Sequence, residues 1–390
     1  MKILFLTFYY RPDLCAGSFR ATPLVDTLAR HVPSGGSIDV VTTQPNRYRS
    51  FSAECAQIER CGVVSIRRVP LPKHASGMID QSRAFATFAH AAVKHAADRK
   101  YDLVVGTSSR LMTAVLAAFI ARRQRARLYL DIRDIFGDTM SDILPAAAAF
   151  GLAPILSALE RYAVSRADAV NLISPGFADY FRSRYPAKKY SFFTNGIDDE
   201  FLRSGSSWQP SPPPAVLTVL YAGNIGEGQG LHAIVPAIAT RLGSRVRFRI
   251  IGDGGRREAL RDELARLGVR NVELLPPVSR ETLHHEYREA DVLFLHLNDH
   301  EAFQKVLPSK IFEYAALGKP IWAGVGGYAS QFIRDELDNA AVFAPCDADA
   351  AVRAFGTLTL GASPRRAFIE RYRRATIDEA LAADILATAR

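Results

Sequence analysis

Short apolar runs alternate with longer amphipathic segments along the first half of the chain. Six runs have the length and composition of buried strands, and they cover residues 3–8, 38–42, 63–69, 103–106, 128–132 and 169–173. Apolar positions recur at helical spacing between several of them, over residues 19–30, 84–97, 112–122 and 155–164. Because strands that alternate with helices form parallel sheets with right-handed crossovers, we expect an α/β unit here.

The same pattern restarts after residues 203–214, which read RSGSSWQPSPPP and contain few core residues. The later strand runs cover residues 219–222, 246–251, 272–275, 292–297, 321–323 and 341–343. Helical patterns cover residues 231–241, 256–267, 280–289, 309–317 and 348–355, and residues 365–390 form one long helical pattern or two short ones. We therefore predict two Rossmann-like, doubly wound domains that face a central cleft.

Four segments follow from this pattern. We expect an N-terminal domain over residues 1–195, a hinge or linker over 196–214, and a C-terminal domain over 215–362. A helical segment over 363–390 is expected to pack back on the N-terminal domain. The two domains agree with the length of 390 residues, which suffices for two cores.

Composition limits the class of protein. Hydrophobic residues make up 48% and charged residues 23%, which is typical of globular chains. No run of about 18 apolar residues occurs, so no transmembrane helix is expected. Arg11 and Asp13 interrupt the apolar start of the chain too early for a signal peptide, which favours a first β-strand. The four cysteines have neither metal-site spacing nor disulfide density, so we expect reduced thiols and a cytoplasmic location.

Charge is distributed unevenly between the halves. Residues 1–195 hold 26 Lys and Arg against 15 Asp and Glu, a net +11, and residues 196–390 carry a net −2. The basic half indicates an anionic partner, such as a membrane surface, a phosphorylated acceptor or a nucleic acid, or else a solvated surface without a partner. No interleaved aromatic and basic platform supports nucleic-acid binding, so none is expected.

Glycines at the starts of helices are candidates for phosphate binding. Gly17 lies at the entry of the first helix, where Ser18 is a candidate N-cap, and a small residue there lets an anion approach the backbone. A plain turn glycine is the alternative.

Four glycines between a strand and a helix, in GNIGEGQG at residues 223–230, suit a diphosphate on backbone amides; a flexible loop is the alternative. The candidate donor-binding residues in this loop are Gly223, Asn224, Gly226 and Gln229.

The glycine loop lacks the G-x-G-x-x-G and G-K-[ST] patterns, which disfavours nicotinamide cofactors and nucleoside triphosphatases. Gly252 follows the next strand in IIGDGG, and a tight turn beside the cleft is at least as good an explanation as ligand contact.

Charged residues supply the remaining candidates. In PSKIFEY, Ser309 is a candidate cap, and Lys310 and Glu313 share one face of a helix. A cation there suits a diphosphate and a carboxylate suits a ribose diol, although an intrahelical salt bridge is the alternative. Arg133 and Asp134 directly follow an apolar strand, where Asp134 could orient or deprotonate an acceptor hydroxyl. Alternatively, both only pair with neighbours or cap a turn.

These elements in this order resemble the retaining glycosyltransferases of family 4, which have the GT-B fold. The resemblance spans nearly the whole chain and is carried by ILFLTFYYRPDLCAGSFR, SPGF, NGID, YAGNIGEGQGL, IIGDGGRREAL, the Ala290–Val292 strand start and PSKIFEYAALGKPI. The AGNIGEGQGL and PSKIFEY pair looks most like the branch that builds bacterial surface polysaccharides with amino- or deoxy-sugars, so the resemblance implies a hexosyl- or amino/deoxy-sugar transferase.

The resemblance implies a role for each matching residue. Glu313 matches the second glutamate of the E-x7-E motif, which holds the donor ribose. Gly223–Gly230 matches the diphosphate loop, and Gly17 the N-domain loop that faces the leaving group. Arg133 and Asp134 lie near the catalytic His-Asp position, and Lys310 is expected to stabilise the leaving diphosphate.

Three departures from the family pattern bear on the site. Lys305 stands where the first glutamate of the motif is expected, and Glu301 could replace that glutamate only with a shifted register. Asn224 and Gln229 occupy places that often hold Arg and Lys, so backbone amides, Lys310, Lys305 and a helix dipole would hold the diphosphate. Arg133 replaces a histidine. Such changes mark a subfamily or an inactive paralogue.

The resemblance implies an enzyme that transfers a sugar from a nucleotide-diphosphate sugar to a saccharide or polyprenyl-diphosphate-linked acceptor, with retention and without a metal or other cofactor. The acceptor and the basic domain suggest peripheral contact with the inner face of the cytoplasmic membrane, through the loops at residues 47–51 and 71–78. A nucleotide-sugar 2-epimerase and a non-catalytic nucleotide-sugar binder have the same fold and remain as alternatives.

Overall fold

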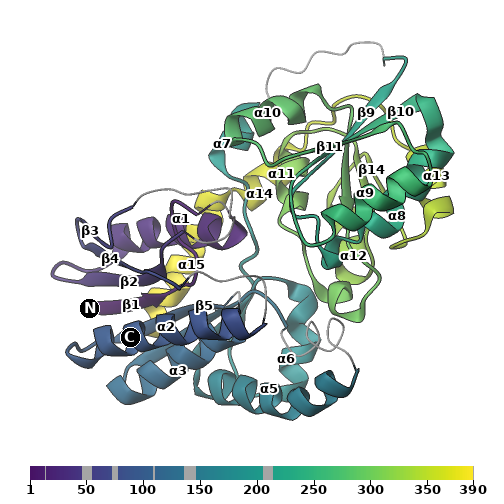
Figure 1. Ribbon diagram of the computed structural model, residues 1–390. Helices are drawn as coiled ribbons and strands as arrows, with labels where there is room; N and C mark the ends of the chain where they lie inside the picture. The colour runs from purple at the N-terminus through teal and green to yellow at the C-terminus, as the bar shows by residue number, and fades with distance from the viewer. Residues whose placement is uncertain are drawn as a thin grey trace. The chain divides into compact units, whose positions relative to one another are not determined.

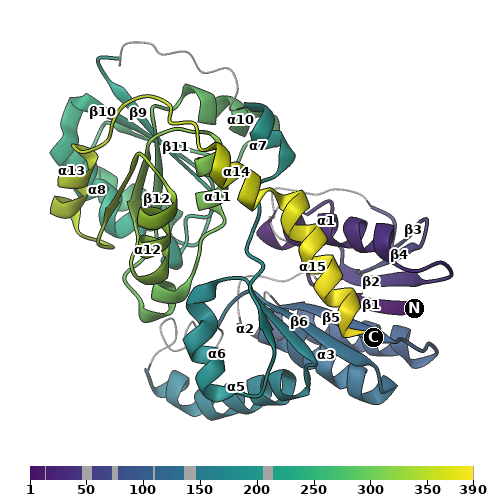
Figure 2. The ribbon, with the colours of Figure 1, turned by 180° about the vertical axis from the view of Figure 1, so that it is seen from behind.

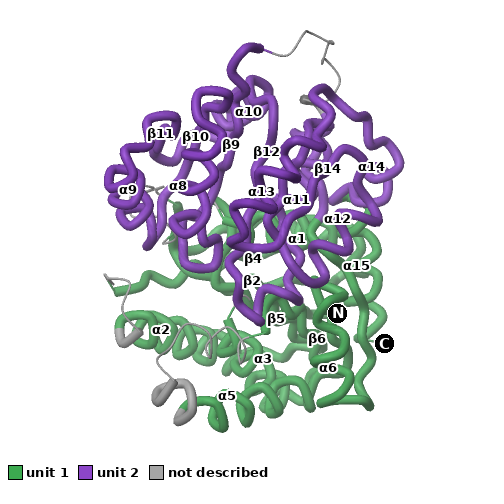
Figure 3. Tube along the Cα trace, turned by 90° about the vertical axis from the view of Figure 1, so that its right-hand side faces the viewer, with its two compact units in different colours: residues 1–195, 375–390 green, residues 196–374 purple. Residues whose placement is uncertain are grey.

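The computed structural model describes residues 1–13, 15–45, 55–72, 78–108, 110–135, 146–204 and 214–389. The chain forms two compact units, one of residues 1–195 with 375–390, and one of residues 196–374 (Figure 3). Among the described residues, no helix combines the length and the apolar character needed to cross a bilayer.

Unit 1 is built on an eight-stranded sheet in the order β3-β4-β2-β1-β5-β6-β7-β8 (Figure 1). Its strands are β1 Lys2–Leu6, β2 Ser37–Thr43, β3 Ile58–Cys61, β4 Val64–Val69, β5 Leu103–Ser108, β6 Arg127–Ile132, β7 Ala169–Leu172 and β8 Tyr190–Ser191. All neighbours pair in parallel except the β3–β4 edge, which is antiparallel. The strand order reverses between β1 and β5, which makes this the switch point of the sheet.

Helices cover both faces of this sheet. They are α1 Ala16–His31, α2 Met78–Ala97, α3 Leu111–Gln124, α5 Ala146–Arg166, η1 Pro175–Phe177, α6 Ala178–Arg184 and α15 Arg374–Thr388. One core joins Leu24 and Leu28 of α1, Leu381 and Ile385 of α15, and the inward side chains of the central strands. Seen from behind, α15 crosses the face of the unit 1 sheet, where its apolar residues join the core (Figure 2).

Unit 2 is built on an all-parallel sheet in the order β11-β10-β9-β12-β13-β14. Its elements are α7 Asp199–Ser204, β9 Leu217–Ala222, η3 Glu227–Gln229, α8 Leu231–Leu242, η4 Gly243–Arg245, β10 Val246–Ile251, α9 Arg257–Arg266, β11 Val272–Leu275, α10 Arg280–Glu289, β12 Val292–His296, η5 Glu301–Lys305, α11 Lys310–Ala316, β13 Ile321–Gly324, α12 Gly327–Glu336, β14 Ala340–Phe343, α13 Ala348–Phe355 and α14 Arg366–Tyr372. The strand order reverses between β9 and β12. The apolar strands bury both faces, as parallel sheets require.

The unit boundaries differ from the sequence-based segments at two places. The first crossing, after Asn195, coincides with the expected end of the N-terminal domain, but residues 196–204 belong to unit 2 and include a helix. Asp198 explains this, because it accepts a hydrogen bond from Arg280 at 2.8 Å and pairs with Arg374. The second crossing lies after Arg374 rather than Ala362, since α14 packs within unit 2 and α15 within unit 1.

Candidate active site

The switch point of unit 2 gathers the candidate donor-binding residues. The carboxyl end of β9 continues into the glycine loop Gly223–Gly230, and the carboxyl end of β12 continues into η5 and α11. The two segments are joined directly, because Asn298 N donates to the carbonyl of Gly228 at 2.9 Å. Open α/β sheets bind ligands at this position, beyond the carboxyl ends of the strands that flank the reversal.

Lys310 lies against the start of the glycine loop. A Cβ atom placed on Gly223 would come within 2.3 Å of the Lys310 Nζ atom, and the backbone φ of Gly223 is +149°. Only glycine combines that conformation with the approach of the ammonium group. Gly252, also at φ +149°, lets β10 approach the loop, since its Cβ would lie 1.8 Å from the Gly223 carbonyl oxygen. The structure therefore gives Gly252 a packing role.

Most loop amides already donate within the protein, which bears on the prediction that the loop holds a diphosphate through its backbone. The N–H groups of Gly223, Ile225, Gly226, Gln229 and Gly230 all have acceptors in the protein. An N–H group that is already paired cannot bind a phosphate oxygen without losing its present bond. The positive charge of Lys310, which lies beside the loop on α11, is therefore a stronger candidate for binding a diphosphate than the paired amides of the loop.

Asn224 and Gln229 shape the loop. The Asn224 side-chain amide donates to Gln229 Oε1 at 2.7 Å, and the same oxygen accepts from Gly226 N at 3.2 Å. The Asn224 carbonyl in turn accepts from the Tyr221 hydroxyl at 2.6 Å. These contacts hold the loop in one conformation, so Asn224 and Gln229 act first as supports for its backbone.

Lys310 and Glu313 are three residues apart on α11 and so lie on one side of that helix. Burial lowers the pKa of Lys310 and raises the pKa of Glu313, and the opposite charge of each residue resists the shift of the other.

Ser309 occupies the N-cap position, but its side chain makes no capping bond, which corrects the expected cap. The Tyr287 hydroxyl donates to Glu313 Oε2 at 3.5 Å.

The segment η5 contains Lys305, which stands where the family pattern has the first glutamate of its motif. Lys305 lies 3.7 Å from Glu301, whose side chain is 86% exposed, so Glu301 does not reach into the site as a buried carboxylate would. The neighbouring Phe303 ring lies against the glycine loop, where a Cβ on Gly228 would come within 2.7 Å of it. Lys305 is thus held at the edge of the same switch point.

His296 is a supporting residue that the sequence did not single out. It is completely buried at the end of β12, where Nδ1 lies 2.7 Å from the Gln229 carbonyl and Nε2 accepts from Cys346 N at 3.0 Å. Burial lowers the pKa of His296 to about 4, so the ring is neutral and donates through Nδ1. Its position one residue before a loop at the end of an apolar strand is the signal that could have identified it.

In unit 1 the structure brings Gly17 and Arg133 together. A Cβ on Gly17 would lie 3.3 Å from Arg133 Nη1 and 3.2 Å from Tyr9 Cβ. The N-cap of α1 is Cys15 rather than Ser18, which is buried inside the first turn, so Gly17 is a helical residue. Burial raises the pKa of Asp134 to about 6, against the opposing charge of Arg133.

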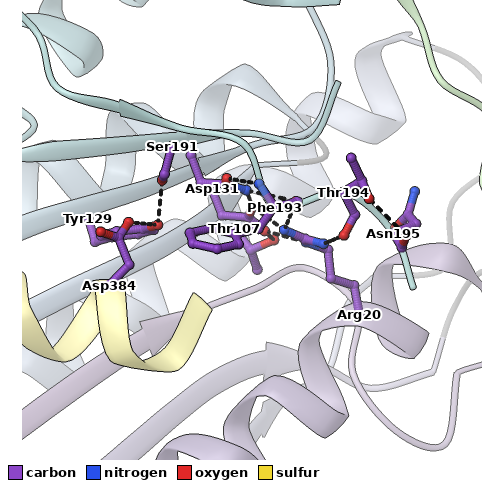
Figure 4. A network of polar contacts seen from close by, with 10 residues as sticks. Arg20, Thr107, Tyr129, Asp131, Ser191, Phe193, Thr194, Asn195 and Asp384 are labelled. Carbon is purple, nitrogen blue, oxygen red and sulfur yellow. Dashed lines mark hydrogen bonds and ion pairs between the residues drawn. The ribbon is translucent and has the colours of Figure 1, made fainter. Parts of the chain in front are cut away.

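A buried polar network lies beneath this edge (Figure 4). Arg20 forms two hydrogen bonds of 2.8 Å with the Asp131 carboxylate and donates to the carbonyls of Phe193 and Thr194. Asp131 also accepts from Thr107 and Asn171. Burial raises the pKa of Asp131, but the charge and hydrogen bonds of Arg20 outweigh burial and lower that pKa overall. The network holds the segment after β8 that leads to the first crossing between units.

The same network continues toward α15, where the Tyr129 hydroxyl donates to Asp384 at 2.8 Å. This part-buried contact ties α15, which follows the second crossing of the chain, to β6 of unit 1. Within the described ranges, His, Cys, Asp and Glu side chains form no group of three that could hold a metal ion.

Two Rossmann-like units, each with polar residues at its switch point, define a class of protein that binds nucleotides on such edges. Family models agree with this division. Residues 21–196 match the Glycosyl transferase 4-like domain, and residues 207–375 match the Glycosyl transferases group 1.

Individual proteins are similar as well. The chain is 27% identical over 341 residues, 82% of each chain, to WcaI of Escherichia coli strain K12, a candidate glycosyl transferase of colanic acid biosynthesis. Sucrose-phosphate synthase from Thermosynechococcus elongatus has a TM-score of 0.68 at 16% identity, covering 100% of this chain and 95% of that chain. Anabaena HepE, solved with UDP and glucose, has a TM-score of 0.63 at 16% identity, covering 99% and 100%.

The two family models together span almost all of the chain between residues 21 and 375. The chain therefore belongs to the family 4-type glycosyltransferases of the GT-B fold, as its sequence motifs suggested.

Proposed function

We propose that the protein transfers a sugar, with retention of configuration, from a nucleotide-diphosphate sugar to a saccharide or lipid-linked saccharide during cell-surface polysaccharide biosynthesis. The observation that carries the proposal is Lys310, whose ammonium group lies against Gly223 at the switch point of unit 2 with Glu313 one turn away. The likeness to WcaI supports the pathway class, and the UDP bound to Anabaena HepE supports a nucleotide-linked donor.

The chemistry of glycosyl transfer suits this arrangement. As the bond between sugar and diphosphate breaks, negative charge grows on the leaving diphosphate, and a preorganised cation lowers the barrier. Lys310 is the group we assign to that charge. Glu313 would accept hydrogen bonds from the two ribose hydroxyls, and Asp134 with Arg133 would act on the acceptor side. No metal or other cofactor enters this proposal.

A panel of nucleotide sugars tests the function. A donor that fits should raise the unfolding temperature of the whole chain, since a ligand that binds only the folded state stabilises it. The same donor should be slowly hydrolysed without acceptor and consumed faster with a saccharide acceptor. If no nucleotide sugar stabilises the protein or is turned over, the proposal fails; stabilisation without turnover would indicate a non-catalytic binder.

Glu313→Ala should weaken binding of the free nucleoside diphosphate by about 1–3 kcal/mol, the scale of lost charged hydrogen bonds. Isothermal titration calorimetry on the folded variant measures this change. Glu301→Ala is the matched control, because the exposed Glu301 side chain should contribute little. Equal affinity in wild type and Glu313→Ala would remove Glu313 from the ribose site.

Contact with an anionic membrane is a further expectation of the lipid-linked acceptor. The candidate residues Arg47, Arg49 and Lys73 lie outside the residues that the structure describes. Each basic side chain near an anionic surface is worth about 1 kcal/mol, so neutralising all three should weaken binding by roughly 100-fold. Sedimentation with anionic and neutral vesicles at rising salt measures the effect.

The control for this prediction neutralises the exposed Arg122, Arg123 and Arg125 near the end of α3, which removes the same charge elsewhere. That variant should keep most of its vesicle binding. A wild-type protein that ignores anionic vesicles at low salt would point to an acceptor in solution.

A further inference from the structure

Two arginines at the carboxyl edge of the unit 1 sheet have no acidic partner among the described residues. Arg110 follows β5, donates Nη2 to the Tyr9 hydroxyl at 3.1 Å, and lies over the Phe8 ring at 4.4 Å. Arg133 follows β6, its side chain has no hydrogen bond or ion pair with another described residue, and its Nε is buried without a partner. Both side chains are half-buried, and the buried Nε of Arg133 is costly to leave without an acceptor.

Tyr9 lies close to both arginines. Arg133 Nη1 lies near the Cβ end of Tyr9, beside Gly17, and Arg110 reaches the hydroxyl at the other end of the ring. The three residues follow the carboxyl ends of β1, β5 and β6, which are neighbours in the sheet. Arg110 therefore follows one strand of the switch point between β1 and β5, where open sheets bind ligands, and Arg133 follows the next strand along the sheet.

Nearby acidic groups compensate Arg133 only in part, because burial lowers the pKa of Arg133 although the charges of Asp131 and Asp134 oppose that shift. The Asp131 carboxylate already receives hydrogen bonds from Arg20, Thr107 and Asn171. Asp134 follows Arg133 directly, yet its carboxylate forms no ion pair with that arginine in the structure, and burial raises its pKa to about 6. Two forked guanidinium groups with free donors match the geometry of a phosphate, which accepts several N–H bonds at once.

We propose that Arg110 and Arg133, held apart by Tyr9, bind a phosphate group of the acceptor. The inference rests on the proposed function and assigns the phosphate or diphosphate of the lipid-linked acceptor to a site in unit 1. The diphosphate of the donor offers the same chemistry, so the test must separate the two sources.

The test uses the full chain and farnesyl diphosphate as a short, soluble probe of the acceptor head group. Calorimetry is run with the nucleoside diphosphate present at saturation, which occupies the donor site. Wild type should bind the probe, and Arg110→Gln should bind it at least tenfold more weakly, because a charged hydrogen-bonding group is lost. Affinity for the nucleoside diphosphate alone should be the same in both proteins.

Two controls accompany Arg110→Gln. Arg123→Gln removes an exposed arginine from the far end of α3, and its affinity for the probe should stay within about twofold of wild type. Arg110→Lys keeps the charge without the fork, so it should recover part of the affinity even if Arg110→Gln folds poorly. Uncharged farnesol should bind far more weakly than farnesyl diphosphate.

Three results would overturn the inference. Wild type could fail to bind farnesyl diphosphate, Arg110→Gln could bind it as tightly as wild type, or Arg110→Gln could lose nucleoside diphosphate affinity to the same degree. The last result would assign the arginines to the donor. Each is distinct from failure of the proposed function, in which no nucleotide sugar binds or reacts.

Discussion

Lys310→Ala is expected to lower the turnover number by about 100-fold to 1,000-fold, the loss typical of one preorganised group that stabilises developing negative charge. Binding of the donor should weaken by much less, about tenfold, because the diphosphate gains charge as the reaction proceeds. A large effect is expected because most N–H groups of the glycine loop are already paired within the protein. Few other groups of the loop can then stabilise the charge that grows on the diphosphate. Steady-state kinetics and calorimetry together separate the two effects.

Lys305→Ala is the matched control, since it removes the other lysine of the same edge. It should leave turnover closer to wild type than Lys310→Ala does. Equal losses in turnover and donor affinity for Lys310→Ala would show uniform binding instead of transition-state stabilisation. A large loss with Lys305→Ala alone would transfer the role to that residue.

Arg20→Met should destabilise unit 1 by about 3–5 kcal/mol, because it leaves the Asp131 carboxylate buried without its main partner. The unfolding transition of unit 1 should fall by roughly 10 °C. Differential scanning calorimetry of the full chain measures this shift. Methionine keeps the length of the side chain, so the loss of charge and hydrogen bonds dominates the result.

The control is Arg127→Met, which breaks an Arg–Asp pair of 2.7 Å in the same unit whose arginine is 59% exposed. A surface pair is worth about 1 kcal/mol or less, so the transition should barely move. A double variant, Arg20→Met with Asp131→Leu, should recover part of the stability because no unpaired charge remains. Similar shifts for Arg20→Met and Arg127→Met would contradict the structural role of the network.

The central strands of both sheets could be predicted from the sequence because they are continuous apolar runs. The run predicted at residues 246–251 is β10 at the same bounds. The edge strands β3 and β8 were missed, since β3 is a short, mostly exposed Ile58–Cys61 and β8 has two residues. Helix α12 was also missed. It begins at Gly327, and glycine is a poor helix former.

The candidate site was predictable in part. The proximity of Lys310 to the glycine loop follows from motifs at the ends of neighbouring strands, and the structure places them together. The pairing of Arg20 with Asp131 joins residues 111 positions apart, and no local pattern indicates which buried charges meet. The hydrogen bonds that the loop N–H groups donate within the protein depend on the backbone angles of the loop. The number of glycines in the sequence does not indicate those angles.

The most direct test of the account follows the sugar itself. The full chain is incubated with the donor identified by stabilisation and with a saccharide acceptor, and proton NMR records the anomeric signals of donor and product. A retaining transferase should release nucleoside diphosphate in step with a new glycosidic bond of the same anomeric configuration as the donor. A sugar that changes configuration while still attached to its nucleotide, or a product with inverted configuration, would contradict the proposed function.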